Sequence, residues 1–392
     1  MNAPPFSQLP ATTVLEPIGT LCAKASNWRD WAEQEARMRW QSLADGAAMP
    51  NPFFEPWYLL PALAAFDPLG QVHLGQVQLF TVAIGDQLVG LLPLHVAARY
   101  GRWRLPHRAT WIHANAFFGA PLVRTGYEVI FWQALLDWAD SACGKALFLH
   151  LPSMPLDQPL TQALFDLASA ENRTAALVMR EQRALLQSTL APEIYLEQAL
   201  TAKKRKELRR QHARLAEQGA LTFARSETEH DIGPWIDQFL RLEHSGWKGK
   251  AGSAMICAPE TEALFRTSLE HAAALGKLER LTLALDDKPI AMRANFLTPP
   301  GSFSYKTAFD EAYARFSPGV LLQRENLALL DRQSIAWCDS CAAPDHPMID
   351  SLWTERRPIG RISIAIGGKN RRRIFNLLNA IELKRNPIGL TL

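Results

Sequence analysis

The stretch LERLTLALDDKPIAMRANFLTPPGSFSYKTAFDEAYARFSPGVLLQRENLALLDRQSIAWCD, residues 278–339, decides the fold. After Gly276 the apolar residues change from a period of 3.6 to a period of 2, which predicts strands joined by tight turns. A helical period then returns before a last apolar run. We expect strands over 278–285, 289–297 and 302–309, a helix over about 318–331, and a strand over 334–338. This order predicts a mixed α/β unit.

The helix of this unit begins at Ser317-Pro318-Gly319. A cap-type residue is followed by Pro, which lacks an N–H, and by Gly, which lacks a Cβ. Backbone N–H groups at such a helix start bind phosphate well. We therefore expect an anion site facing an open cleft, made by Ser317, Pro318, Gly319 and Val320, with Arg315 just before it.

The rest of the chain also alternates between helices and strands. In the second half we expect helices over 200–218, 231–245 and 259–275, the first of them strongly basic. In the first half we expect a helix over 26–45, a hairpin of 77–84 with 88–94, a helix over 127–142, a strand over 146–150 and a helix over 160–169. A chain of 392 residues is long enough for two domains, and a weakly periodic segment predicts the boundary near residue 190.

Composition favours a globular, cytoplasmic protein. Hydrophobic residues make up 48% of the chain and charged residues 21%, which is ordinary for a folded domain. No apolar run approaches the roughly 18 residues that a membrane-spanning helix needs, and we expect no secretory signal. Five cysteines in a chain of this length fit a reducing compartment better than a disulfide framework.

The net charge of +3 hides an asymmetry. Nine Lys or Arg and one Glu from Arg356 to the end give +8, which leaves −5 for the remainder. We divide the chain into residues 1–190, 191–368 and a basic amphipathic tail, 369–392, whose apolar residues have the spacing of a helix that lies in a lipid interface. An anionic membrane surface is one partner for this tail, and a solvated extension is the other interpretation.

Three segments carry a resemblance to a known family: Leu242–Gly252, Tyr305–Gly319 and Asp339–Ala342. They resemble the CelD-like branch of GNAT acyltransferases, which is akin to the FemABX peptidyltransferases. Residues 51–63 and 119–122 are weakly similar to the first domain of the same proteins. The resemblance implies tandem GNAT-like domains with mixed, largely antiparallel sheets. It also implies acyl-CoA as the donor substrate, lying between the strand before Asp310 and the strand ending near Asp339.

The loop that would hold the donor departs from the usual GNAT pattern Arg-x-x-Gly-x-Gly/Ala. Counted from Arg315, the glycine Gly319 stands one residue later, and the second small residue is missing. Fem relatives with degenerate loops use aminoacyl-tRNA, so a tRNA-dependent transferase is an alternative. A non-catalytic GNAT-like module that binds an anionic lipid or acyl-CoA for polysaccharide or lipid assembly is a second alternative.

Amide formation needs a base for the acceptor amine and donors for the developing oxyanion. The candidates for the base are Asp310, Glu311, Glu243, Asp339 and His346, and each carboxylate can instead be a solvated or ion-paired group. Tyrosine often protonates the departing thiolate in GNAT enzymes, and Tyr313 is the candidate here. A tyrosine that only packs in the core or a loop is the other interpretation.

Candidate substrate contacts are Trp247 and Lys248, in a glycine-bounded loop, and Lys306 and Arg293, on adjacent predicted strands. Cys338 and Cys341 form a C-x-x-C pair, but no second pair exists, so we expect no closed structural zinc site. A nucleophilic Cys341 activated by His346 is also conceivable.

Taken together, these features predict an acyl-CoA-dependent N-acyltransferase. A lipid acceptor such as a sphingoid base, or an envelope polysaccharide precursor, would fit the basic tail. Attachment at the inner membrane surface would then be peripheral.

Overall fold

The computed structural model describes residues 19–68, 77–344 and 346–385. Their strands form one sheet in the order β1-β2-β3-β4-β6-β13-β7-β12-β11-β10-β9-β8, with β5 paired to β3. The strands are β1 (Leu21–Asn27), β2 (Gln78–Ile84), β3 (Gln87–Ala97), β4 (His107–Thr110), β5 (Leu122–Val123), β6 (Phe148–Pro155), β7 (Ala175–Leu186), β8 (Leu221–Ser226), β9 (Leu278–Leu285), β10 (Lys288–Thr298), β11 (Gly301–Phe309), β12 (Trp337–Asp339) and β13 (Glu355–Ala365).

The helices of the described residues divide between the two halves of the chain. Those of the first half are α1 (Gln34–Asp45), α2 (Pro56–Phe66), α3 (Glu128–Ser141) and α4 (Pro159–Ala170). Those of the second half are α5 (Pro192–Ala199), α6 (Ala202–Ala216), α7 (Ile232–Ser245), α8 (Trp247–Lys250), α9 (Pro259–Ala274), α10 (Pro318–Asn326), α11 (Pro347–Asp350) and α12 (Lys369–Arg385). Short 3-10 helices are η1 (Trp28–Trp31), η2 (Pro52–Phe54), η3 (Met255–Cys257), η4 (Glu311–Phe316) and η5 (Leu327–Asp331).

The expected mixed α/β fold with a largely antiparallel sheet is confirmed. Two pairings within the described sheet are parallel, β4 with β6 and β11 with β12, so each half of the chain contains one. The three strands expected over 278–309 form as a continuous antiparallel ladder. The expected first helix is partly wrong, because Ser26 and Asn27 end β1, the Asn27 side chain caps η1, and α1 begins only at Gln34.

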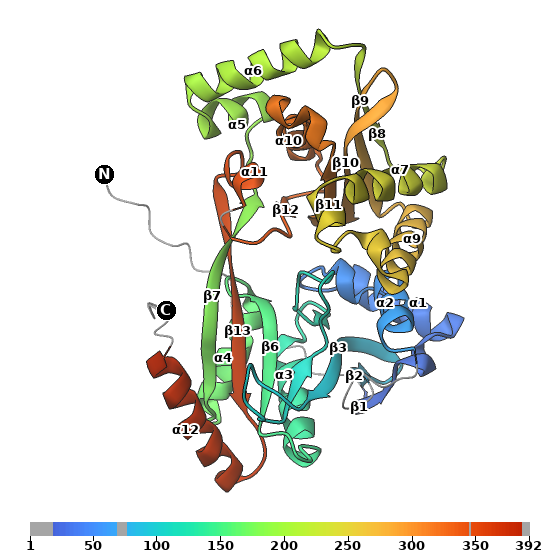
Figure 1. The fold of residues 1–392 in the computed structure, drawn as a ribbon. Coiled ribbons are helices and arrows are strands. Elements are labelled where there is room, and N and C mark those ends of the chain that lie inside the picture. The colour runs from blue at the N-terminus through green and yellow to red at the C-terminus, as the bar shows by residue number, and fades with distance from the viewer. Residues whose placement is uncertain (1–18, 69–76, 345, 386–392) are drawn as a thin grey trace.

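The two halves share strands. β13, which follows the C-terminal unit in sequence, lies between β6 and β7 and pairs antiparallel with both. β7 in turn pairs with β12. In Figure 1 these long strands run side by side from one half of the molecule to the other. A division at residue 190 therefore separates segments that belong to a common sheet.

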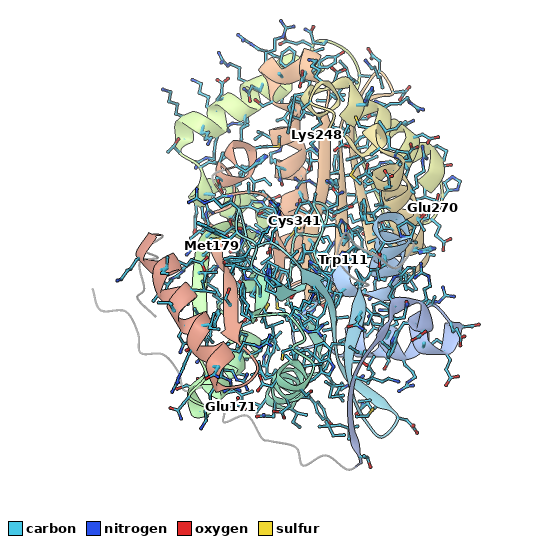
Figure 2. All side chains as sticks on the ribbon, turned by 60° about the horizontal axis from the view of Figure 1, so that its bottom comes forward. Trp111, Glu171, Met179, Lys248, Glu270 and Cys341 are labelled. Carbon is cyan, nitrogen blue, oxygen red and sulfur yellow. The ribbon has the colours of Figure 1, made fainter. Side chains whose placement is uncertain are left out.

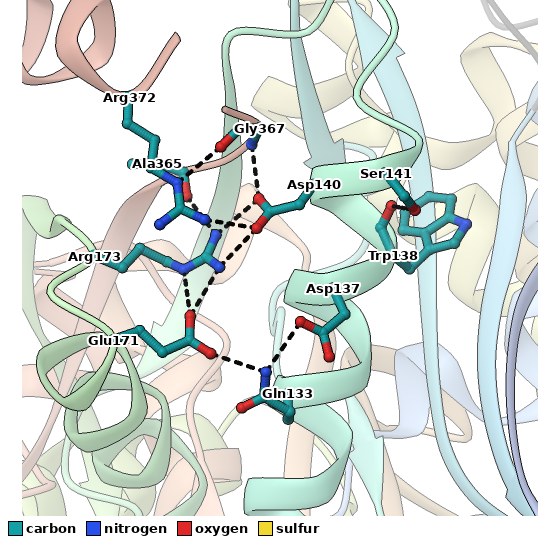
Figure 3. Close-up of polar contacts among 10 residues, drawn as sticks. All are labelled: Gln133, Asp137, Trp138, Asp140, Ser141, Glu171, Arg173, Ala365, Gly367 and Arg372. Carbon is teal, nitrogen blue, oxygen red and sulfur yellow. Dashed lines mark hydrogen bonds and ion pairs between the residues drawn. The ribbon is translucent and has the colours of Figure 1, made fainter. Parts of the chain in front are cut away.

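A partly buried ion-pair cluster around Arg173 joins the end of β13 to α3 and α4 (Figure 3). Both guanidinium Nη atoms of Arg173 donate to the two carboxylate oxygens of Asp140 at 2.9 Å. Asp140 also accepts from the Gly367 N–H at 2.7 Å and from Arg372 at 2.6 Å. Burial by itself would raise the pKa of Asp140, but the hydrogen bonds from Arg173 and Gly367 outweigh it and the pKa is lowered.

Replacing Asp140 with Asn is expected to lower the free energy of unfolding by about 1–3 kcal/mol, because the change removes an acceptor from a buried guanidinium. The loss should shrink as the pH falls through the lowered pKa of Asp140, since the wild-type carboxylate is then protonated too. Urea unfolding at neutral and acidic pH measures both effects. Asp137→Asn, one helical turn away and exposed, serves as the control, and equal losses in the two variants would contradict the prediction.

The tail helix α12 packs on the first half through Phe375, whose ring lies 5.5 Å from that of Phe148. Arg371 donates to the carbonyl oxygens of Gly144 and Ala146, and Arg372 joins the Asp140 cluster. Two of the three consecutive arginines are thus held by protein groups, and Arg373 remains exposed. None of the helices in the described ranges has both the length and the apolar character to cross a membrane.

Candidate functional site

A β-bulge in β11 positions the central side chains. Ala294 faces Lys306 and Asn295 faces Ser304, so Tyr305 is an extra residue in the ladder. A bulge re-aims side chains locally. Here both Tyr305 and Lys306 reach groups of the N-terminal half, where the loop after β4 supplies Asn115.

Lys306 is a cation in a mostly uncharged setting. Its Nζ donates to Asn115 Oδ1 at 2.7 Å and lies 5.4 Å from the ring centre of Phe117. Burial, helped by the nearby charge of Lys248 and opposed by Glu243, lowers the pKa of Lys306 to about 8. A cation of this kind can stabilise negative charge that develops on a substrate oxygen.

Two tyrosines close one side of this lysine. The hydroxyl oxygens of Tyr58 and Tyr305 lie 3.3 Å apart, and the Tyr58 hydroxyl donates to the Asn115 carbonyl oxygen at 2.6 Å. Burial raises the pKa of both tyrosines, so both stay protonated. His113 stacks on Tyr58, and burial lowers its pKa to about 3. These groups therefore form a neutral wall beside Lys306.

Glu243 and Lys248 form the other side of the site. Glu243 is almost fully buried on α7, accepts from Lys248 Nζ at 2.7 Å and from the Met255 N–H at 2.8 Å. Lys248 also donates to the Thr307 carbonyl oxygen at 3.3 Å. A Cβ at Gly249 would lie 1.8 Å from the His244 carbonyl oxygen, so the close turn after α7 requires glycine there. Trp247 is exposed, at 58%.

Arg293 lies under α10. Its guanidinium donates to Gln323 and to Thr307 Oγ1, and burial lowers its pKa to about 10. Because Arg293 pairs in register with Thr307 and not with Lys306, the two cations do not lie side by side on one face.

The segment after β12 runs beside the site. Asp339 is fully buried, contacts Arg357 at 3.1 Å and Arg183 at 3.6 Å, and accepts from the Cys341 N–H. Burial raises the pKa of the Cys341 thiol well above its ordinary value. Thiolate is the reactive form of cysteine, so this environment disfavours a nucleophilic role. In Figure 2 Cys341 lies near the centre of the molecule, between Lys248 and Trp111.

His346 belongs to the same region. Its Nδ1 is buried with no hydrogen-bond partner among the described residues. Burial lowers the pKa of His346, Asp350 raises it, and the charges of Arg293 and Lys248 lower it. A neutral imidazole with a free ring nitrogen is available there.

The remaining candidates stand at the other end of β11. Asp310 caps η4 through the Ala312 N–H and contacts Lys288 at 3.4 Å. Glu311 accepts from the Trp247 N–H at 2.6 Å and from Lys250 at 2.9 Å, and these hydrogen bonds lower its pKa. Tyr313 is partly buried and packs against the apolar cluster that contains Phe316 and Leu215. Asp310, Glu311 and Tyr313 therefore each have contacts that give them a structural role.

The start of α10 differs from the expected phosphate cradle. The Ser317 N–H donates to Ala314 O and the Val320 N–H to Ser317 O. Pro318 and Gly319 are buried, and a Cβ at Gly319 would lie 2.8 Å from Met348. The prediction that Ser317, Gly319 and Val320 present free N–H groups to an open cleft is therefore wrong, because the turn uses two of these donors itself and α11 covers the third residue.

A basic hollow lies next to this turn. Arg210 and Arg214 of α6 and Arg315 of η4 line a cavity of about 270 Å³, together with Glu207, Gln211, Glu217, Gln218 and Phe316. Arg210 is paired with Glu207 at 2.6 Å, while Arg315 lies over the Phe316 ring. Arginines gathered around a hollow provide the donors that phosphate groups need.

The structure adds Tyr58, His113, Asn115 and Tyr305 to the predicted residues. Tyr58 falls within the segment 51–63 and Tyr305 begins the segment 305–319, so for both residues the resemblance to the family was the available signal. Asn115 contacts Lys306, which lies 191 positions away in the sequence. A local sequence pattern cannot predict a contact between residues so far apart in the chain. In the ranges with defined coordinates, no group of three or more His, Cys, Asp or Glu side chains is placed to hold a metal ion.

Comparison with known proteins bears on the fold of the chain. Residues 202–346 match the family model described as an acetyltransferase (GNAT) domain. No functionally curated protein matches the chain in sequence. Among solved structures, FemX has a TM-score of 0.55 at 9% identity, and the match covers 88% of this chain and 98% of FemX.

Two further structures show the same fold. The C-terminal domain of a putative lysylphosphatidylglycerol synthetase from Agrobacterium fabrum has a TM-score of 0.53 at 12% identity, covering 89% of this chain and 96% of that one. A conserved protein of unknown function from Bacteroides thetaiotaomicron has a TM-score of 0.50 at 10% identity, covering 84% and 97%. Residues 202–346 thus resemble a GNAT acetyltransferase domain, and they lie within a larger fold that is similar to that of FemX.

Proposed function

We propose that the chain is an N-acyltransferase of the cytoplasm that moves an acyl group from acyl-CoA to an amine acceptor at the junction of its two halves. The observation that carries the proposal is Lys306, a cation with a lowered pKa, held by Asn115 of the other half. In acyl transfer the carbonyl oxygen of the thioester becomes negatively charged as the amine attacks. Lys306 would hold that charge, and the neighbouring Tyr305 hydroxyl would add a hydrogen bond, since the Tyr58 hydroxyl already donates to the Asn115 carbonyl oxygen.

Proton removal from the amine is assigned to Glu243. Its carboxylate is buried and already bonded to Lys248 and Met255, so it lies within a network that reaches the strand of Lys306. His346, neutral and with a free ring nitrogen, is the second candidate for this step. Asp310 and Glu311 are less suited, because their side chains are 18% and 34% exposed to solvent, whereas that of Glu243 is 2% exposed.

The donor phosphates are assigned to the basic hollow of Arg210, Arg214 and Arg315. This hollow adjoins η4, which directly follows the strand β11 that carries Lys306, so we assign the path of the donor to β11. The hollow replaces the helix start as the anion site, and it keeps Arg315 in its expected role. Trp247, exposed beside Lys248, would contact the acceptor.

The acceptor class that we favour is a lipid amine, such as a sphingoid base. The second class is an envelope polysaccharide precursor, which is in keeping with the CelD-like resemblance. The likeness in fold to a domain of a putative lysylphosphatidylglycerol synthetase supports a lipid. So does α12, whose outer side exposes Ile374, Leu377 and Ile381 at 50, 65 and 44%. An exposed apolar stripe flanked by Arg373 and Lys384 suits peripheral attachment to an anionic membrane.

A tRNA-dependent transfer is the second candidate function. The observation that favours it is α6, which exposes Lys203, Lys204, Lys206, Arg209, Arg210 and Arg214 to solvent. Such a basic surface also fits a polynucleotide. A non-catalytic binding module is the third candidate function. Such a module would bind the donor without turning it over.

A thiol-release assay tests the proposal. Purified protein, acyl-CoAs of several chain lengths and a sphingoid base or a simpler amine should yield free CoA and an amide. Arg214→Gln with Arg315→Gln should raise KM for acyl-CoA about tenfold or more, because two charged contacts to phosphate are lost. Lys203→Gln, on the same helix but outside the hollow, should leave KM unchanged. Absence of thiol release together with co-purifying tRNA would replace acyl-CoA by aminoacyl-tRNA.

A further inference from the structure

A second cavity, of about 570 Å³, lies between α12 and the sheet of the N-terminal half. Its volume is within the range of about 300–1,000 Å³ that is typical of small-molecule sites. No residue that lines it belongs to the site around Lys306 or to the basic hollow. The cavity therefore requires an explanation that goes beyond the proposed function.

The wall of this cavity is mostly apolar. It is made by Trp103 and Leu105 from the loop between β3 and β4, Phe148 from β6, and Phe375 and Leu378 from α12. Trp103 is 52% exposed although it is one of the largest apolar side chains. An aliphatic chain would cover this surface and remove it from water.

Polar groups are found at defined places in the same cavity. Arg102 and Arg361 line it and are exposed to solvent. Glu382, also on the wall, is engaged by the Tyr100 hydroxyl, which donates to Oε1 at 2.6 Å. Its carboxylate therefore has a partner within the protein, while the two arginines are available to an anion.

Asn379 gives an independent indication of a ligand. Its side chain lines the cavity and is 9% exposed, and its Oδ1 has no hydrogen-bond partner among the described residues. A buried amide oxygen without a donor is costly. A ligand hydroxyl, such as that of a glycerol unit, would satisfy it.

We infer that this cavity binds a single-chain anionic amphiphile: one aliphatic chain against the aromatic wall, with its acidic headgroup at Arg102 and Arg361. A lysophospholipid and a free fatty acid share this chemistry. Ile381 both lines the cavity and belongs to the exposed stripe of α12. A lipid could thus enter from the surface that is proposed to lie against the membrane.

Calorimetry with monomeric ligands tests this inference. Palmitoyl lysophosphatidylglycerol should bind at least about tenfold more tightly than palmitoyl lysophosphatidylcholine, because only the first carries net negative charge. Glycerol phosphate, which lacks the chain, should not bind measurably. Palmitate distinguishes the two kinds of ligand. If palmitate binds as tightly as the lysolipid, the cavity is a fatty acid site. If palmitate binds more weakly, the glycerol unit of the lysolipid contributes through Asn379.

Variants locate the binding. Arg102→Gln with Arg361→Gln should weaken the lysophosphatidylglycerol complex about tenfold or more, whereas Arg373→Gln, an exposed arginine of α12 outside the cavity, should not. Leu378→Trp should fill the cavity and abolish binding of both lysolipids. If this variant does not fold, the affinity of the double arginine variant tests the inference. Equal affinity in the arginine pair and wild type, or binding to phosphatidylglycerol vesicles but to no monomeric lipid, would overturn the inference.

Discussion

Replacing Lys306 with methionine is expected to lower kcat/KM for acyl transfer by about 10²–10³-fold, the effect usually seen when one oxyanion donor is removed. Methionine keeps the length of the side chain but has neither charge nor donor. The Asn115 side chain then loses its partner, and the tyrosine wall remains. KM for the donor should change little, because the proposed phosphate contacts lie in the basic hollow.

The pH profile separates a catalytic cation from a structural one. Lys306 has a pKa of about 8, below its ordinary value of 10.5. The charged form is present below that pKa, so turnover that needs the cation falls as the pH rises through about 8. Lys306→Met should lack this alkaline limb.

Lys288→Met is the matched control, because Lys288 lies on β10, is exposed, and has Asp310 as its one ion-pair partner among the described residues. Its kcat/KM should match that of the wild type, with the alkaline limb intact. A Lys306→Met enzyme with unchanged kcat/KM would remove the lysine from the mechanism.

The part of the fold that could be predicted from sequence is the part with local patterns. The ladder β9-β10-β11 and helices α7 and α9 have clear periods of 2 and 3.6, and they form within one or two residues of the expected bounds. β7 and β13 were missed. β13 is buried between β6 and β7, and its sequence ERRPIGRISIA mixes charges with a proline and a glycine. Its strand state depends on partners far away in sequence, which no local window contains.

The site was predicted only in part for the same reason. Glu243, Lys248, Lys306 and His346 were singled out by residue type and resemblance. The structure pairs Glu243 with Lys248 and joins Lys248 to the strand of Lys306. The phosphate cradle at Ser317 failed because a local signal, a cap followed by Pro and Gly, carries no information on what covers the helix start. Met348 covers it, and the turn bonds its own N–H groups.

Asp339 illustrates how a plausible base can have a structural role. The carboxylate is fully buried at the end of β12, between Arg357 of β13 and Arg183 of β7. These strands join the two halves of the sheet. Arg357 also stacks 4.0 Å over the ring centre of Trp337, and Arg183 donates to the Phe117 carbonyl oxygen. The carboxylate therefore balances two buried cations at the joint.

Replacing Asp339 with Asn is expected to lower the free energy of unfolding by about 3–5 kcal/mol, the cost of leaving buried charge without its counter-ion. Urea unfolding of the full chain measures the loss. Asp331→Asn is the control, since Asp331 is exposed at the end of η5 and its charge balances no buried cation. A variant Asp339→Asn with wild-type stability but strongly reduced turnover would return Asp339 to the role of the base. A large loss of stability instead leaves Glu243 and His346 as the candidates for proton removal.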